Sequence, residues 1–211
     1  GANHTVLLRS DGRVVACGSN RDGQCSIPEL EDGVLYSSLS AGWYHTVLLR
    51  SDGRAAACGS NVRDQCNIPD ADDGMAYVQV SAGASHTVLL RCDGRAVACG
   101  WNQHGQCDIP DLDDRVVYSQ VSAGLTHTVL LRSDGRAVIC GRNPCSIQYR
   151  IPEPEDGVVY LHVSAGEYHT VLLRSDGVAM SYGSSVDGQC ALPELTGDLF
   201  FVPAGPAKDF V

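Results

Sequence analysis

The segment His-Thr-Val-Leu-Leu-Arg occupies residues 45–50 and recurs unchanged at 4–9, 86–91, 127–132 and 169–174. Successive copies begin 41, 41, 41 and 42 residues apart. Such regularity along a whole chain is typical of tandem-repeat proteins, in which each repeat is one structural unit that packs on its neighbours. The five copies therefore predict five equivalent units.

Each unit contains three segments with the composition of β-strands. The apolar centre of the quoted segment, Val47-Leu48-Leu49, is continuous, whereas a strand with one exposed face would alternate apolar and polar residues. A strand of the type Tyr77 to Gly83 precedes this segment, and one of the type Arg95 to Cys99 follows it after a Ser-Asp-Gly sequence. Because glycine accepts a positive φ and aspartate tolerates it, Ser-Asp-Gly predicts a tight reversal between antiparallel strands.

A small sheet that is apolar on both faces can be buried only between similar sheets. We therefore predict an all-β fold, a β-propeller with three- to four-stranded antiparallel blades. The alternative, a β-solenoid, usually has repeats of about 20 to 30 residues and lacks a hairpin in each. We expect one domain over residues 1–211, with units at about 1–35, 36–76, 77–117, 118–159 and 160–198 and a closing strand at 199–211.

Two longer patterns recur around these strands. Ala-Gly-x-x-His-Thr-x-x-Leu-x-x-Asp-Gly, followed by Cys-Gly-x-Asn-x-x-Gly-Gln, covers 82–106 and returns through essentially the whole chain. This combination resembles the repeat of the regulator of chromosome condensation family, in a short form similar in length to the repeats of bacterial propeller-type β-lactamase inhibitors. The resemblance implies a β-propeller. One departure is that the family often has Trp just before the glycine of the Cys-Gly pair, where this chain has Cys17, Cys58, Cys99, Cys140 and Tyr182.

The number of blades depends on the C-terminal segment. Members of the family resemble seven-bladed rings, whereas each strand type occurs five times here if 199–205 is counted as a first strand. The chain then ends half a unit out of phase with its start, so the C-terminal strand can join the N-terminal hairpin. We expect closure as five blades, because open sheet edges promote aggregation. An arc of a seven-bladed ring is the alternative.

The charge of the chain excludes several classes of partner. The formal net charge is −10, and the 15 basic residues are 14 arginines and Lys208. Nucleic-acid binding requires a basic surface that neutralises phosphates, so we expect no nucleic acid as partner. No apolar run approaches the length of about 18 residues that a spanning helix needs, so we expect a soluble protein without membrane insertion. The start at Gly1 is compatible with a longer chain or complex.

The five histidines at equivalent positions do not predict a metal site. Equivalent positions on neighbouring blades should lie about 10 Å apart, whereas a zinc ligand lies about 2.0 to 2.3 Å from its metal. We interpret each histidine as fixing its own turn by hydrogen bonds. The sequence contains no Gly-x-Ser-x-Gly elbow, no phosphate loop and no His-Glu-x-x-His motif. We therefore predict no catalytic residue, no metal, no cofactor and no enzymatic activity.

The ten cysteines indicate the cellular compartment. Three pairs with a spacing of eight residues, such as Cys58 and Cys66, can approach each other within a blade. However, Tyr149 and Tyr182 replace one member of the pair in other units, and Cys92 stands where the other units have serine. A disulfide framework would not leave such unpaired thiols, so we favour reduced cysteines and an intracellular protein, cytoplasmic or nuclear. Disulfides within blades are the alternative.

The units differ most at one end of the predicted blades, where the Ala-Gly-x-x-His turn and the start of the connector lie. The opposite end carries the Ser-Asp-Gly turns, where we expect solvated pairs such as Arg50 and Arg54 near Asp72 and Asp73. Both tryptophans and several arginines fall at the variable end, and these residue types anchor protein interfaces. Neutral drift in exposed loops is the alternative. The predicted partner-binding residues are Trp43, Tyr44, Trp101, His104, Tyr168, Glu167, Arg21, Arg63 and Arg142.

The leading functional prediction is a non-enzymatic protein–protein interaction module that uses this loop face. A carbohydrate-binding propeller is one alternative, although it would need the same aromatic and polar groups in every unit. The family also includes a nucleotide exchange factor and propellers within giant ubiquitin ligases. The resemblance thus implies two more alternatives, an exchange-factor-like regulator and the substrate-binding arm of a larger ubiquitin ligase, because fold alone does not determine function.

Overall fold

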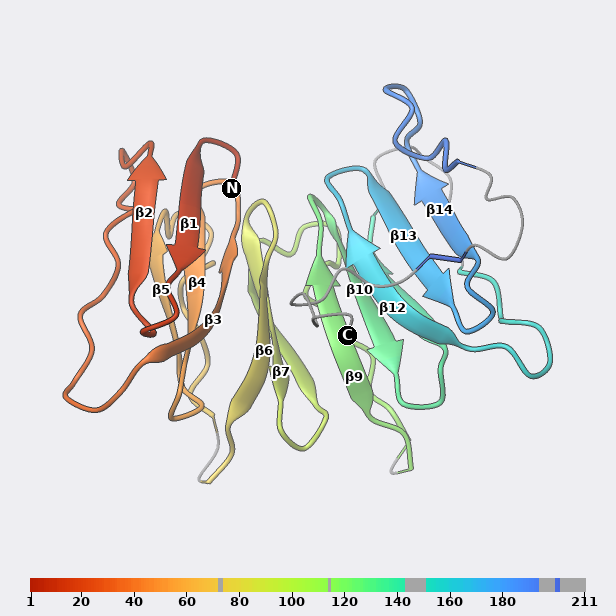
Figure 1. The fold of residues 1–211 in the computed structure, drawn as a ribbon, viewed down its shortest axis with the longest axis horizontal. Coiled ribbons are helices and arrows are strands. Elements are labelled where there is room, and N and C mark those ends of the chain that lie inside the picture. The colour runs from red at the N-terminus through yellow and green to blue at the C-terminus, as the bar shows by residue number, and fades with distance from the viewer. Residues whose placement is uncertain (72–73, 114, 143–150, 194–199, 202–211) are drawn as a thin grey trace, which may run out of the picture.

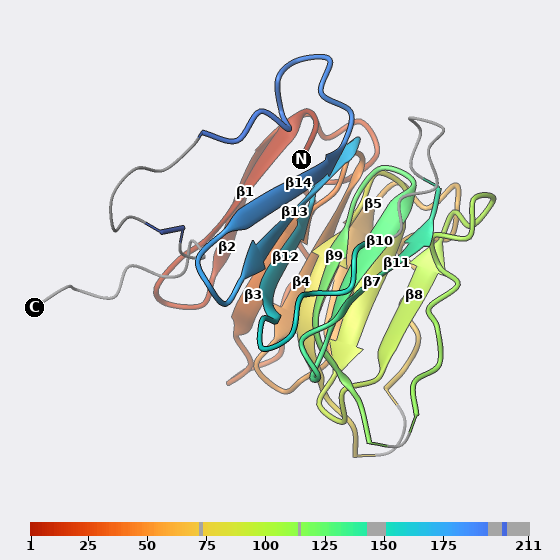
Figure 2. The same cartoon turned by 90° about the vertical axis from the view of Figure 1, so that its right-hand side faces the viewer.

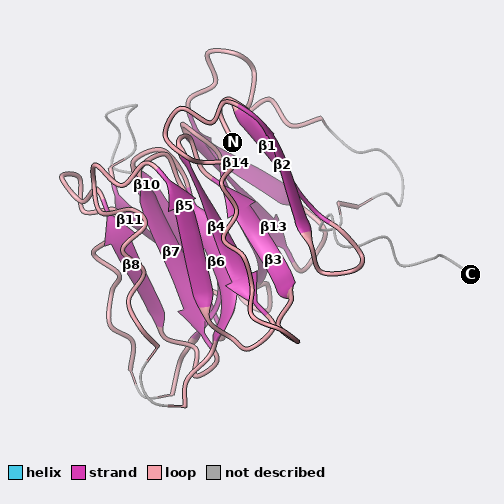
Figure 3. Ribbon diagram, turned by 90° about the vertical axis from the view of Figure 1, so that its left-hand side faces the viewer, coloured by secondary structure: helices cyan, strands magenta, loops and turns pink. Residues whose placement is uncertain are grey.

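The computed structural model describes residues 1–71, 74–113, 115–142, 151–193 and 200–201. These residues form strands and loops and no helix (Figures 1 and 3). The strands build five antiparallel sheets, one for each copy of the repeat, which confirms the predicted all-β architecture. The first sheet has two strands and each of the other four has three.

The repeated His-Thr-Val-Leu-Leu-Arg segment is the middle strand of every three-stranded sheet. In chain order the strands are β1 (His4–Leu8), β2 (Val14–Gly18), β3 (Tyr36–Ala41), β4 (His45–Arg50), β5 (Ala55–Gly59), β6 (Tyr77–Ala82), β7 (His86–Arg91), β8 (Ala96–Gly100), β9 (Tyr118–Ala123), β10 (His127–Arg132), β11 (Ala137–Gly141), β12 (Tyr160–Ala165), β13 (His169–Arg174) and β14 (Ala179–Gly183).

The third sheet shows why the repeat folds as it does. In β7 the five residues from His86 to Leu90 are all buried, as the continuous apolar run predicts. Leu89 lies opposite Val80 of β6 and Val97 of β8. The reversal between β7 and β8 has Gly94 at a φ of +78°, which a residue with a side chain rarely adopts. The predicted hairpin is therefore confirmed together with the role of its glycine.

The core lies between neighbouring sheets. Val47 and Leu49 of β4 pack against Val80 and Leu89 of the next sheet, while Leu48 points to the other side of β4 and is also fully buried. The sheets follow one another across Figure 1 from β1–β2 to β12–β14. In Figure 2 the two end sheets lie to one side of the middle sheets, so the row is curved.

The repeated histidines link adjacent blades. His45 Nε2 lies 3.0 Å from Thr87 Oγ1, and this hydroxyl donates to the backbone oxygen of Gln65 at 2.7 Å. The same His–Thr bond joins the other neighbouring pairs of sheets, as His4–Thr46, His86–Thr128 and His127–Thr170. The expectation that the histidine ring fixes its own turn by hydrogen bonds was therefore wrong for these four rings: Nε2 bonds to the following blade, and Nδ1 has no hydrogen-bond partner among the described residues. The turn is closed by the backbone instead, as in the bond from the Gly42 N–H to the His45 carbonyl oxygen at 2.9 Å.

The first blade has an exposed surface at its end of the row. Thr5 is exposed, whereas its four equivalents are fully buried. Leu7 is 60% exposed, whereas its equivalents Leu48, Leu89, Leu130 and Leu172 are 0% exposed. Of the expected closing segment 199–211 only Phe200 and Phe201 are described, so closure as five blades stays a prediction.

The nine described cysteines are free thiols. Cys66 Sγ donates to the Ser60 carbonyl oxygen at 3.3 Å and Cys58 Sγ to the Gln24 carbonyl oxygen at 3.7 Å. Each member of this pair thus has its own backbone acceptor. These contacts favour the reduced state that we expected over a disulfide within the blade.

We expect Cys17 and Cys92 to react with iodoacetamide far faster than Cys140. The first two are exposed, whereas Cys140 is buried and burial raises its pKa to about 12 from the ordinary 9.0. Since the thiolate is the nucleophile, this shift lowers its fraction about a thousandfold. Timed alkylation of the native protein followed by peptide mass spectrometry measures the rates. Equal rates at the three positions would contradict the burial of Cys140.

Candidate partner-binding face

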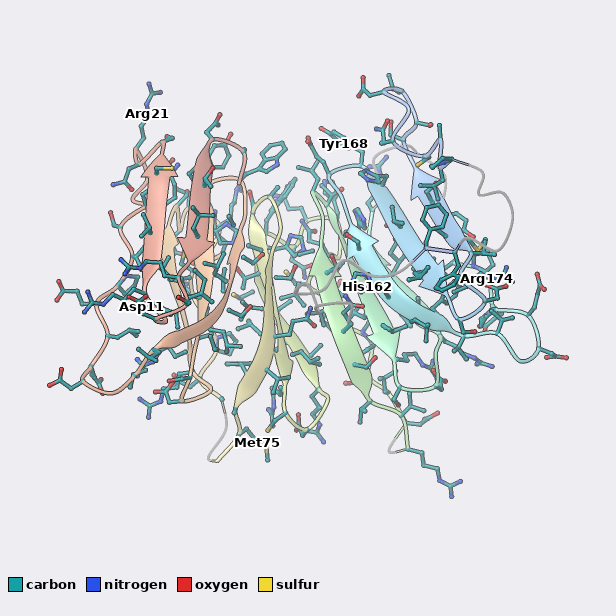
Figure 4. The ribbon with its side chains drawn as sticks, in the orientation of Figure 1. Asp11, Arg21, Met75, His162, Tyr168 and Arg174 are labelled. Atoms are coloured by element: carbon teal, nitrogen blue, oxygen red, sulfur yellow. The ribbon has the colours of Figure 1, made fainter. Side chains whose placement is uncertain are left out.

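The variable loops lie at one end of the blades. Figure 4 shows Arg21 and Tyr168 at the upper side of the molecule, whereas Met75 lies at its lower side and Asp11 at the lower end of the first blade. The turns between first and second strands and the loops that leave the third strands share the upper end, because strands alternate in direction within each antiparallel sheet. We call this end the variable face.

A hollow of about 510 Å³ lies in the middle of the variable face. Its floor is made by the Ala-Gly pairs of the repeated turns, such as Ala82-Gly83 and Ala123-Gly124. Glycine is required there because a Cβ on Gly83 would collide with the Gly124 carbonyl oxygen and the His86 ring. Because the alanine and glycine residues of the floor are small, the hollow stays open between the larger side chains at its rim.

Aromatic and acidic side chains border this hollow. Trp43 and Tyr44 line it from the β3–β4 turn, and Glu167 lines it from the β12–β13 turn. The Trp43 and Tyr44 rings meet edge to face with centroids 6.1 Å apart. Glu167 also raises the pKa of the neighbouring Tyr168 by hydrogen bonding to its phenol. Residues far apart in sequence thus converge on one site.

A second cluster joins the connectors of two neighbouring units. The Arg63 guanidinium lies 5.9 Å from the centroid of the Trp101 ring, within the range of a cation–π interaction. The His104 ring packs against Trp101 at a centroid distance of 4.9 Å and an angle of 70°. Arg63 is exposed, and Trp101 and His104 are half-buried. The charged guanidinium group of Arg63 therefore lies over the Trp101 ring and remains accessible to a partner.

The nine predicted residues thus divide into groups. Six belong to the hollow or to the second cluster, and Tyr168 lies next to Glu167 without lining the hollow. Arg21 lines a separate depression with Asn3 and Asn20, and the exposed Arg142 follows β11. The prediction missed Leu125, which also lines the central hollow. The sequence could have indicated Leu125, because it directly follows the turn glycine Gly124, as Trp43 follows Gly42 in its own unit.

The opposite end of the blades is uniform. An arginine at the end of each middle strand pairs with the aspartate two residues later: Arg9–Asp11 2.7 Å, Arg50–Asp52 2.7 Å, Arg91–Asp93 3.0 Å, Arg132–Asp134 2.6 Å and Arg174–Asp176 2.6 Å. The predicted partners Asp72 and Asp73 lie outside the described residues, and Arg50 forms its ion pair with Asp52 within its own turn.

A larger hollow of about 630 Å³ opens at this uniform end, between Arg95, Ile109 and Leu112. The Arg91–Asp93 ion pair forms part of its wall, and this pair recurs in every unit. We therefore regard this hollow as part of the repeated scaffold. Within the part of the chain that the structure describes, no group of three or more His, Cys, Asp or Glu side chains can hold a metal ion. The described segments also contain no helix that is long and apolar enough to cross a membrane.

Five segments of the chain match the family model described as the regulator of chromosome condensation (RCC1) repeat. They cover residues 1–24, 36–65, 77–106, 118–146 and 161–189. Comparison with curated protein sequences gives no match.

Solved structures of several propellers resemble the chain. Prp20p from Saccharomyces cerevisiae has 22% identity and a TM-score of 0.70, over 86% of this chain and 56% of that one. Human WBSCR16 has 16% identity and a TM-score of 0.74, over 90% and 62% of the two chains. The ectodomain of the receptor kinase ACR4 from Arabidopsis thaliana has 19% identity and a TM-score of 0.66, over 92% and 66%. This similarity confirms the propeller fold, and the chain spans less than two thirds of each relative.

Proposed function

Because the chain belongs to the RCC1 repeat family, we propose that it is a non-enzymatic protein-interaction module that binds its partner through the variable face. The observation that carries the proposal is the convergence of Trp43, Tyr44 and Glu167 on one hollow. Nearby units add Arg63 stacked over Trp101. Tryptophan, tyrosine and arginine are the residues that contribute most of the energy of protein interfaces.

The shape of the hollow fits a side chain of a protein partner. Its Ala-Gly floor is small and apolar, its rim is aromatic, and Glu167 supplies one negative charge at its edge. An apolar side chain flanked by a basic group would satisfy all three features. The related structures support a protein partner, since yeast Prp20p binds Gsp1p and histones and has been solved in complex with Kap60.

Two further observations support a non-enzymatic role inside the cell. The rings of His45, His86 and His127, which could otherwise act as acids or bases, are fully buried and bonded between blades. The described cysteines are free thiols, which is the state that a reducing compartment maintains.

The double substitution Trp43→Ala and Trp101→Ala should abolish partner capture without unfolding the chain. Removal of two hot-spot residues weakens a protein complex by about 30-fold or more, the factor that corresponds to about 2 kcal/mol. The measurement is quantitative affinity capture from a lysate of the source organism, with the unmodified chain and the double variant as parallel baits.

The matched control is the double variant Arg54→Ala and Arg95→Ala at the uniform end, where both side chains are exposed. It should retain every partner that the unmodified chain captures. Loss of partners from this control, with full capture by the tryptophan variant, would place the site at the uniform end and contradict the proposal.

A further inference from the structure

We propose that the two exposed ends of the blade row are complementary and join two copies of the chain head to tail. The contact would reproduce the interface that already joins each blade to the next one. The two surfaces that meet in this interface differ. We call the side of a blade that faces the following blade its outgoing side, and the side that faces the preceding blade its incoming side. In the interior of the row each outgoing side meets the incoming side of the following blade.

The polar bonds of the interior interface repeat from blade to blade. The outgoing side supplies a histidine Nε2 and a serine hydroxyl, as in His45 and Ser40 of the second blade. The incoming side supplies a threonine hydroxyl and a backbone N–H, as in Thr87 Oγ1 and the N–H of Ala82, which lies 2.9 Å from Ser40 Oγ. The bonds from Ala123 to Ser81 and from Ala165 to Ser122 repeat the second contact at 3.0 and 2.9 Å.

The apolar part of the interface is equally regular. On the outgoing side of β4, Val47 is fully buried against the following sheet. On the incoming side of β7, Leu89 is fully buried against the preceding sheet. The same pair recurs as Val88 with Leu130, and as Val129 with Leu172. Each blade therefore needs a neighbour on both sides to bury its middle strand.

The last blade presents an unused outgoing side. Its Ser164 is exposed, whereas the equivalent serines are half-buried under the following blade. Val171 and His169 are half-buried, whereas the equivalent valines and histidines of the middle blades have no exposed surface. The serine, histidine and valine that contact the following blade elsewhere in the row are therefore all present in the last blade and partly accessible to solvent.

The first blade presents an unused incoming side. Thr5 and Cys17 are exposed, Leu7 is 60% exposed and Val15 is 49% exposed. Among the described residues, the first sheet also has no counterpart of the first strand of the other sheets, which is β3 in the second sheet. The Phe201 N–H donates to the Gly177 carbonyl oxygen at 3.1 Å, which is the bond that starts this strand elsewhere, as in Tyr118 with Gly94 at 2.8 Å. Phe201 thus makes, beside the last blade, the contact with which a first strand starts in the other blades, and the β1–β2 hairpin of a second copy can pack at this end of the row.

A head-to-tail contact of this kind makes a specific prediction, because each copy has one outgoing and one incoming side. Leu7→Asp should block the incoming side, and Ser164→Arg should block the outgoing side. Each variant alone should stay monomeric at concentrations where the unmodified chain associates, with the affinity reduced at least about tenfold. An equimolar mixture of the two should form a dimer and nothing larger, since it retains one intact pair of sides.

Sedimentation velocity over a dilution series measures these states on the full chain. Both substituted residues are exposed, and circular dichroism checks that the variants keep the β-sheet signal. Val78→Asp is the control, since Val78 is 53% exposed on β6 in the interior of the row and should leave association unchanged. A monomeric unmodified chain at all concentrations would overturn the proposal and favour closure within one chain. Association of either single variant, or a mixture that stays monomeric, would also overturn it.

Discussion

Acidification from neutral pH to about pH 5 is expected to lower the free energy of unfolding of the chain by about 6 kcal/mol. Burial lowers the pKa of His45 to about 4, of His86 to about 3 and of His127 to about 4, from the ordinary value of 6.5. The unfolded chain binds protons near 6.5, whereas the folded chain resists them. The stability is therefore complete above about pH 6.5 and is lost as the pH falls toward the folded pKa values.

The hydrogen-bond network explains why these rings stay neutral. Thr87 uses its only hydroxyl hydrogen to bond the Gln65 carbonyl oxygen, so it must accept its second bond from the N–H at Nε2 of His45. Nδ1 of His45 is then the bare nitrogen, and it is buried without a hydrogen-bond partner among the described residues. A second proton would place a charge on that nitrogen. Each of the three rings contributes about 1.4 kcal/mol per pH unit in the window between about pH 6.5 and 4.

Urea unfolding at a series of pH values between neutral and about 5 measures this dependence. His86→Gln should lower the stability at neutral pH and reduce the slope of stability against pH by about one third, because one of three buried rings is removed. His104→Gln is the matched control, since His104 lies at the variable face and outside the bonds between blades. An unchanged slope in His86→Gln would show that the buried rings do not cause the acid sensitivity.

Much of the fold follows from patterns within one repeat. The continuous apolar run Val47-Leu48-Leu49 predicts a strand covered on both faces, and the structure buries all three residues. The glycine of each reversal is predicted from its turn chemistry and has a positive φ. The bond from His45 to Thr87 was not predicted, because it joins residues 42 positions apart and leaves no signal within a single unit. Periodicity identifies equivalent positions but not which of them meet across blades.

The candidate site was predicted in part for the same reason. Trp43 and Glu167 occupy equivalent turns, and a curved row of blades brings such turns together around its inner side. The contact between Arg63 and Trp101 depends on side-chain conformations in two connectors, which the repeat pattern does not specify. Arg21 and Arg142 lie at the predicted end of their blades, but the structure places them in neither cluster.

Leu89→Ala is expected to destabilise the chain by about 3 to 4 kcal/mol, whereas Leu7→Ala should cost less than about 0.5 kcal/mol. The two leucines occupy the same position in the repeat and the same kind of strand. Leu89 is fully buried between the second and third blades, and its truncation leaves a cavity there. Leu7 is 60% exposed at the end of the row, so its truncation removes little buried surface. Urea unfolding at neutral pH measures both values.

This pair of substitutions also reports on the ends of the row. Closure of the ring within one chain would bury Leu7 against the last blade, and Leu7→Ala would then cost as much as Leu89→Ala. Association between copies would bury Leu7 as well, but that contribution disappears on dilution, whereas closure within one chain does not depend on concentration. A small cost for Leu7→Ala in dilute solution is therefore the expected result, and a large cost that persists at every dilution would mean that the five blades close on themselves.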